Sequence, residues 1–207
     1  MGFLKWLLGQ SERIATFLPD RIWLTQEAKL AGISAELEKS LRTPKPPAGI
    51  VLASHFEENL ATLRALGEQR SAPVEVTRAD RLHESAIGSS PLTESQTVLI
   101  LVDERHPLRD HDVEIIEFAR SLSCRAQVAF HVSLEDPLMR HFVGDWVQNI
   151  LKKLGMSEGE AIESAMVSRR IEAAQKEILK KSVSDLVTGS SREWIRRNCP
   201  EMWREMQ

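Results

Sequence analysis

The stretch Thr97-Val-Leu-Ile-Leu-Val102 decides the fold, because such a run of β-branched and apolar residues is typical of a strand buried on both faces of a sheet. Weaker strand signals lie at residues 50–54, 73–77 and 128–132, the last of which is predicted to close the sheet. Apolar residues recur at helical spacing between these strands, at Phe56, Leu60, Leu63 and Leu66 and again at Ile115, Ile116, Ala119 and Leu122. The alternation predicts an α/β fold with a mostly parallel sheet flanked by helices. Residues 79–95 are rich in turn formers and are predicted to form a loop.

The two ends of the chain have helical periodicity only. Residues 1–18 are predicted to form an amphipathic helix that ends at Pro19, and residues 25–41 a second helix, followed by the proline-rich segment 42–49. We therefore divide the chain into an N-terminal amphipathic helix (1–18), an α/β domain (20–135) and a C-terminal helical arm (136–207).

The C-terminal arm is predicted to contain three helices. Asp136 before Pro137 can cap the first helix, which carries Leu138, Phe142, Trp146, Ile150 and Leu154. Ser157 and Glu160 have capping-box spacing, and the helix that they begin runs to about Lys181. Its inward-facing residues are predicted to be Ile162, Ala165, Ile171, Ala174 and Ile178. The last helix, residues 191–206, carries Trp194 and Trp203.

Composition excludes several classes of protein. The chain has 207 residues and a net charge of −3, which gives no general attraction to nucleic acid. Its two cysteines, Cys124 and Cys199, match no zinc pattern and are expected to be free thiols in a reducing compartment. No apolar run is long enough to span a bilayer, and residues 1–9 lack the features of a signal peptide. We expect a cytoplasmic protein.

Two segments near the C-terminus resemble SecA, the protein-translocation ATPase. They are Ser133-Leu-Glu-Asp-Pro-Leu-Met-Arg140 and Lys152-Lys-Leu-Gly-Met-Ser-Glu-Gly-Glu-Ala-Ile-Glu163, which look like the passage from the second motor domain into the helical scaffold. The resemblance continues at Val167, Ile171 and 173–176, and upstream at Glu104-Arg105-His106. It implies a RecA-like α/β domain followed by the start of a helical scaffold, and partners in protein translocation.

The nucleotide chemistry of that family has no counterpart in these residues. The sequence contains no Gly-x-x-x-x-Gly-Lys-Ser/Thr phosphate loop. The family's Gln-x-x-Gly-Arg-x-x-Arg element would fall at 114–121, where this chain has Glu114, Glu117, Phe118 and Ser121 at the four key positions. Because arginines of this kind neutralise charge on the transferred phosphoryl group, we expect no ATP hydrolysis and no bound cofactor. The leading hypothesis is a non-catalytic, pseudo-ATPase binding or scaffold protein.

The segment Asp103-Glu-Arg-His-Pro-Leu-Arg-Asp-His-Asp112 supports an alternative hypothesis. His106, His111 and the carboxylates are suitable metal ligands at the end of a core strand, as a small metal-dependent enzyme would need. The interpretation that we favour for this segment is a solvated loop in which Asp110 or Asp112 caps the next helix. A nucleotide-binding regulator without hydrolysis is a third hypothesis, which the missing arginines disfavour.

Candidate interaction surfaces lie at both ends of the chain. Phe3, Trp6 and Leu7 would suit a membrane surface, a partner's groove or the protein's own core. The other candidate interaction residues are Arg140, Trp146, Arg169 and Arg170. Arg169 and Arg170 begin a basic stripe with Lys176, Lys180 and Lys181, in which Glu172 and Glu177 can form ion pairs. We expect a protein partner, either a translocase component or a polypeptide client, and peripheral membrane contact through the N-terminal helix.

Overall fold

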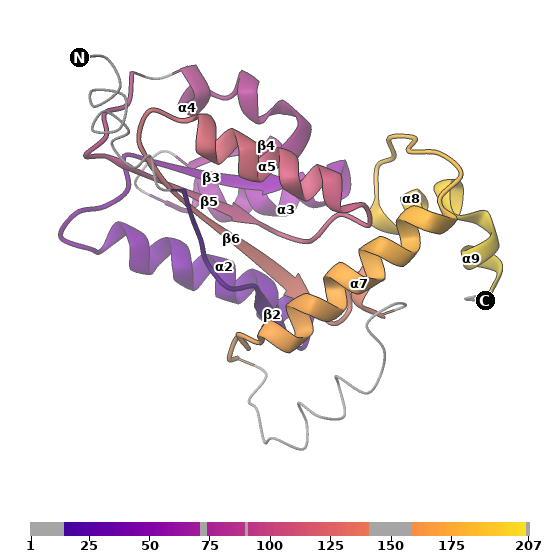
Figure 1. Ribbon diagram of the computed structural model, residues 1–207. Coiled ribbons are helices and arrows are strands. Elements are labelled where there is room, and N and C mark those ends of the chain that lie inside the picture. The colour runs from indigo at the N-terminus through magenta and orange to yellow at the C-terminus, as the bar shows by residue number, and fades with distance from the viewer. Residues whose placement is uncertain (1–14, 71–73, 90, 141–158, 206–207) are drawn as a thin grey trace, which may run out of the picture.

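The computed structural model describes residues 15–70, 74–89, 91–140 and 159–205 (Figure 1). Its strands are β1 (Ala15–Phe17), β2 (Arg21–Trp23), β3 (Gly49–Ser54), β4 (Val74–Arg78), β5 (Thr97–Val102) and β6 (Arg125–Ser133). They form a six-stranded sheet within these described ranges, in the order β1-β6-β5-β3-β4, with β2 also paired to β6. Each of these pairings is parallel. The predicted α/β fold with a mostly parallel sheet is confirmed.

Helices cover both faces of the sheet. They are α2 (Gln26–Leu41), α3 (Glu57–Glu68), the 3-10 helix η1 (Ala79–Glu84), α4 (Ala86–Ser89), α5 (Arg109–Ser121), α7 (Ala165–Lys181), α8 (Ser191–Asn198) and α9 (Pro200–Glu205). Alternate strand residues face opposite sides, so Leu99 and Leu101 pack with α2 and α3, whereas Val98 and Ile100 pack with α5. Apolar side chains of α7, α8 and α9 belong to the same hydrophobic cluster as α5.

The first two strands correct the prediction of a helix over residues 1–18. Residues 1–14, which include Phe3, Trp6 and Leu7, lie outside the described residues, but Ala15–Phe17 forms β1 and pairs with residues 126–128 of β6. β2 then pairs with residues 131–133 of β6. The strand β6 is therefore an interior strand and not the closing strand. Pro19, which has no N–H to donate, separates the two short pieces of edge strand.

Helix α2 packs closely against this edge because of Gly32. A Cβ atom at Gly32 would lie 2.0 Å from the indole ring of Trp23. The absence of a side chain thus lets the Trp23 ring rest on the helix backbone, where the indole N–H donates to Nδ1 of His131 at 3.2 Å. The predicted helix over 25–41 is confirmed.

Other sequence predictions need smaller corrections. The predicted loop 79–95 contains η1 and α4. The helix predicted to begin at Ser157 begins instead at Ala165 with Ser164 as its N-cap, and Ala165 is exposed. Ile162, predicted to face inward from that helix, instead forms an isolated bridge to Ile22. The final helix is split at Cys199 into α8 and α9, because Pro200 begins a new helix. Residues 141–158, with Trp146, lie outside the described residues.

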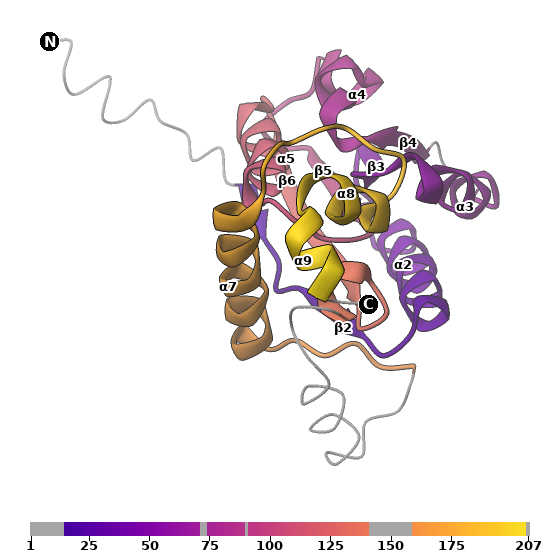
Figure 2. The ribbon, with the colours of Figure 1, turned by 90° about the vertical axis from the view of Figure 1, so that its right-hand side faces the viewer.

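The C-terminal helices lie across the carboxyl ends of the strands. Figure 2 shows α8 and α9 in front of the strand ends, with α7 along one side of the domain. Trp194 of α8 is buried and its ring lies against His106, which follows β5. No helix in the described ranges is long and apolar enough to cross a membrane.

Candidate functional site

The richest group of polar side chains lies where β3, β5 and β6 end. The segment that follows β5 supplies Asp103, Glu104 and His106, all of which are buried. Because the carboxyl ends of parallel strands meet at one edge, His55 after β3 and Asp136 after β6 lie near the same end of the sheet. This is the position that open α/β sheets commonly use for a ligand.

Asp112 is the centre of one hydrogen-bond network. Its carboxylate accepts from Nε2 of His55 at 2.9 Å, from the backbone N–H of His106 at 3.0 Å and from Nε2 of Gln175 at 2.7 Å. Arg105 adds a longer contact at 3.4 Å. Burial alone would raise the pKa of Asp112, but the Arg105 guanidinium and the His55 hydrogen bond lower it to about 2. Asp112 therefore joins α5 to α7 and does not cap α5, whose N-cap residue is Leu108.

Arg105 extends this network to the edge strand. Its guanidinium pairs with Asp20, between β1 and β2, and lies 3.6 Å from the centre of the Phe130 ring. Asp20 also accepts a hydrogen bond from the Ser168 hydroxyl of α7 at 2.7 Å. Polar contacts of this network therefore hold α7 against the sheet, in addition to the apolar packing of the same helix.

A second cluster surrounds Lys29 on α2. Its ammonium group lies 2.8 Å from Oδ1 of Asp136, and both side chains are 3% exposed. The other oxygen of Asp136 accepts a hydrogen bond from the backbone N–H of Ser133 at 2.7 Å. The Asp136 side chain was predicted to cap a helix, but these two contacts occupy its oxygens instead. Burial alone would lower the pKa of Lys29, but Asp136 and Asp103 raise it above its ordinary value of 10.5. Lys29 is therefore protonated at neutral pH.

Two more carboxyl groups lie near this ammonium group. Burial raises the pKa of Asp103 from 3.8 to about 6, against the opposing effect of Lys29. Burial and the neighbouring Asp103 raise the pKa of Glu104 well above its ordinary value. Oε1 of Glu104 accepts a hydrogen bond from the amide of Asn59 at 2.7 Å. Both side chains are buried and are not directed at solvent.

The titration of Asp103 leads to a prediction for Asp103→Asn. Since the native pKa is raised, the native state binds more protons than the unfolded state between about pH 4 and 6, and stability falls as pH rises through 6. The variant should therefore be more stable than the native protein by about 1–3 kcal/mol at pH 8 and nearly equal to it at pH 4. Urea unfolding at the two pH values measures this. An equal or lower stability of the variant at pH 8 would contradict it, and the exposed Asp110→Asn is the control.

A cavity of about 190 Å³ opens beside the network. His55, His106, His111, Asp185 and Trp194 are among its lining residues. The imidazole rings of His106 and His111 are 4.0 Å apart between centres. Burial, with His55 and His111 nearby, lowers the pKa of His106 well below its ordinary value of 6.5. Both histidines of the predicted 103–112 cluster therefore face one cavity, whereas Asp103, Glu104 and Asp112 of the same segment are engaged elsewhere.

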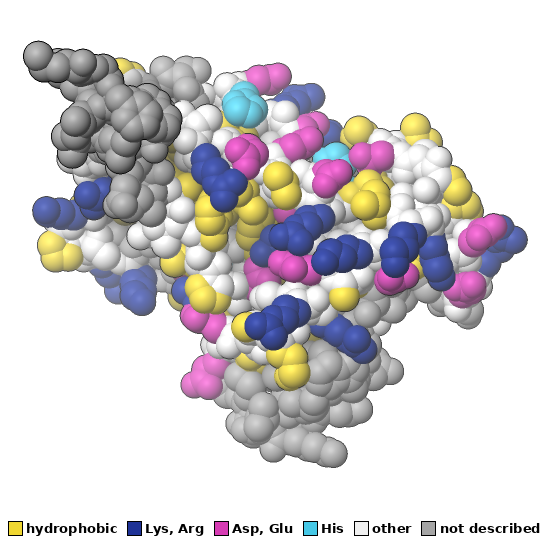
Figure 3. Space-filling view, in the orientation of Figure 1, with side chains coloured by type: hydrophobic (Ala, Val, Ile, Leu, Met, Phe, Trp, Pro, Cys, Tyr) yellow, Lys and Arg dark blue, Asp and Glu magenta, His cyan; other side chains and the backbone are white. Residues whose placement is uncertain are grey.

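The predicted interaction residues that the structure describes do not line this cavity. Arg140, Arg169 and Arg170 are exposed. In the basic stripe on α7, Glu177 pairs with Lys180 at 2.7 Å, whereas Glu172 contacts Arg109 of α5 at 3.4 Å. Figure 3 shows lysine and arginine side chains spread along this face with acidic ones between them. The surface is of mixed charge.

The sequence did not predict several residues of the site, which are Lys29, His55, Gln175 and Asp185. Gln175 belongs to this group as a contact of Asp112. The burial of Lys29 could have been predicted from its spacing. It lies four residues before Ile33 and eight before Leu37, on the buried face of α2. A lysine on such a face needs a buried partner. Asp185 had no such signal, since it comes from the segment between α7 and α8, whose path the periodicity does not predict.

Comparison with known proteins assigns most of the sheet to a family. The family model described as the SecA P-loop domain matches residues 48–159. Proteins named protein translocase subunit SecA are similar over longer stretches. One from Nitratidesulfovibrio vulgaris (strain Miyazaki F) is 31% identical over 183 residues, which covers 77% of this chain and 22% of the relative. One from Nitratiruptor sp. is 34% identical over 142 residues, which covers 69% of this chain and 16% of the relative.

A shorter match has higher identity. The protein translocase subunit SecA 1 of Rhodopirellula baltica is 44% identical over 79 residues, which covers 38% of this chain and 6% of the relative. The chain spans at most about a fifth of the length of these curated relatives.

Proposed function

The chain belongs to the SecA family, and on that premise we propose that it is a non-catalytic binding or scaffold protein, accessory to protein translocation. The proposal depends mainly on which residue occupies position 118 and on its burial. In the resemblance to SecA this position corresponds to an arginine that faces nucleotide, whereas here Phe118 is 1% exposed and packs in the main hydrophobic cluster.

Two other residues of the 114–121 element make contacts within α5. Glu117 pairs with Arg120 on the same helix at 2.6 Å, and the Ser121 hydroxyl donates to the carbonyl of Phe118 at 2.7 Å. The sequence has no phosphate loop. Loss of one catalytic arginine commonly lowers the rate of phosphoryl transfer by about 10³-fold or more. The combined losses support a protein without ATPase activity.

An apolar surface supports a protein partner. Leu179, Val183, Leu186 and Val187, which we call the 179–187 patch, are 56–70% exposed at the end of α7 and in the segment that follows. Exposed groups of large apolar side chains commonly mark sites of protein–protein contact. The relatives are named translocase subunits, so the partner that we propose is a translocase component or a polypeptide client. We place the protein in the cytoplasm; membrane contact through residues 1–18 stays a prediction.

Binding to these partners tests the proposal. The purified chain should bind either full-length SecA with its membrane channel or an unfolded export substrate in a surface-immobilised assay. The double variant Leu186→Glu and Val187→Glu should weaken binding by about 10-fold or more, since it places charge in the apolar contact. Met166→Glu is the matched control, because Met166 is equally exposed at the other end of α7. Absence of binding to all of these partners would contradict the proposal.

A further inference from the structure

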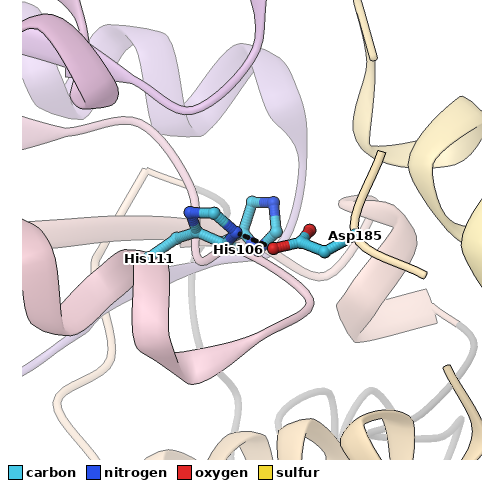
Figure 4. Close-up of side chains that lie close together, drawn as sticks. All are labelled: His106, His111 and Asp185. Atoms are coloured by element: carbon cyan, nitrogen blue, oxygen red, sulfur yellow. Dashed lines mark hydrogen bonds and ion pairs between the residues drawn. The ribbon is translucent and has the colours of Figure 1, made fainter. Parts of the chain in front are cut away.

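We propose that His106, His111 and Asp185 form a binding site for a divalent transition-metal ion, of which Zn²⁺ is the best fit. One ligand atom from each of the three lies within 4.8 Å of the others, in the cavity at the carboxyl end of the sheet (Figure 4). The two histidines come from the segment after β5 and the first turn of α5. The carboxylate comes from the segment that joins α7 to α8, so the ion would link that segment to the α/β domain.

The orientation of His111 suits metal binding. Its Nε2 atom lies 2.8 Å from Oδ2 of Asp185, and its Nδ1 atom lies 3.5 Å from a carboxylate oxygen of Glu114. Metal-bound histidines usually donate their other N–H to a carboxylate or a carbonyl, which fixes the ring and the tautomer. Here Nε2 donates its proton to the Asp185 carboxylate; a bound ion would take the place of this proton, and Nδ1–H would then be directed to Glu114.

The other two ligands are held in the same manner. Nδ1 of His106 accepts a hydrogen bond from the backbone N–H of Leu108 at 3.0 Å and lies 3.2 Å from the Leu108 carbonyl oxygen, so these contacts fix the ring. Binding of an ion at Nε2 requires the tautomer in which Nδ1–H donates to this carbonyl oxygen. The second oxygen of Asp185 accepts a hydrogen bond from the indole N–H of Trp194 at 3.0 Å. Each of the three side chains therefore has a contact that fixes its orientation.

The donor set selects the class of metal. Two imidazoles and one carboxylate are the protein ligands that zinc commonly uses when further positions are left for water, and other borderline transition ions accept the same donors. Mg²⁺ and Ca²⁺ prefer oxygen ligands and should bind weakly. The other acidic groups in the cavity, Glu114 and Asp80, add negative potential, although Asp80 is paired with Arg78 at 2.6 Å.

The test is a metal titration of the untagged full chain after removal of metal by a chelator. Competition with a chromophoric indicator should give one Zn²⁺ per chain, and Co²⁺ should give the visible absorption of a low-coordinate site. Zn²⁺ at about 100 times its dissociation constant should raise the melting temperature by about 5 °C or more.

Variants with matched controls decide whether these residues are the ligands. Asp185→Asn keeps an oxygen for the Trp194 N–H but loses the carboxylate charge, and His111→Gln removes an imidazole; each should weaken Zn²⁺ binding by at least about 10-fold. Asp110→Asn and His83→Gln make the same chemical changes at exposed positions outside the cavity and should leave binding unchanged. Binding of less than half an equivalent, or equal affinity in Asp185→Asn and the native chain, would overturn the proposal.

Discussion

Replacing Lys29 with methionine is expected to lower the free energy of unfolding by about 3–5 kcal/mol, because it leaves buried carboxylates without their cation. Asp136 would lose its 2.8 Å contact, and Asp103 and Glu104 would lose the positive charge that favours their ionised forms. Urea unfolding at pH 7 measures the loss. The loss should be smaller at pH 4, because the raised pKa values of Asp103 and Glu104 let both groups bind a proton there.

The exposed Lys39 of the same helix provides the control for Lys29. Lys39→Met makes the same change at the surface and should alter stability by no more than about 0.5 kcal/mol. The double variant Lys29→Met and Asp136→Asn should recover part of the loss, since it removes both members of the pair. If Lys29→Met cost no more than Lys39→Met, the buried pair would not have the role that we assign to it.

Replacing Asp112 with alanine is expected to cost about 3–5 kcal/mol, because the carboxylate is an acceptor for several buried donors at once. His55, the backbone N–H of His106 and the amide of Gln175 would lose their partner together. Arg105 would keep only Asp20 as its acidic partner in the described network. Thermal unfolding followed by circular dichroism measures the loss.

Amide hydrogen exchange shows which segments Asp112→Ala destabilises, and so distinguishes loss of this network from a general loss of stability. Because Gln175 lies on α7, amide hydrogen exchange in Asp112→Ala should increase first in α7 and in the 103–108 segment. Asp110→Ala, two residues away and exposed, should leave exchange and melting temperature unchanged. An equal effect of the two variants would show that Asp112 does not connect α5 to α7.

The parts of the fold that the sequence predicted are those in which periodicity and burial agree. The strand Thr97–Val102 and the helix 25–41 are of this kind, since their apolar residues repeat over many positions. The strands β1 and β2 were missed because each has only three residues, and their identity depends on pairing with β6, which lies far away in the sequence. A short apolar segment next to a proline fits a helix and an edge strand equally well.

The candidate site was predictable only where its residues are neighbours in sequence. His106 and His111 fall in one dense polar segment, and the structure places both in one cavity. The predicted capping role of Asp112 was wrong, because its carboxylate contacts Gln175 of α7 and α5 begins before it. Asp136 does stand before the helical turn that begins at Pro137, but its side chain pairs with Lys29, which lies far away in the sequence. His55 and Asp185 depend on how β3 and the segment after α7 reach the end of the sheet, which is a property of the tertiary structure.

Titration calorimetry of the full chain with Mg·ATP and Mg·ADP tests most directly the central claim, that a SecA-family fold persists here without nucleotide chemistry. The buried Phe118, with no phosphate loop in the sequence, predicts no saturable heat up to ~1 mM nucleotide, a range that covers ordinary substrate affinities. Saturable binding of one nucleotide per chain at micromolar concentration would contradict the claim.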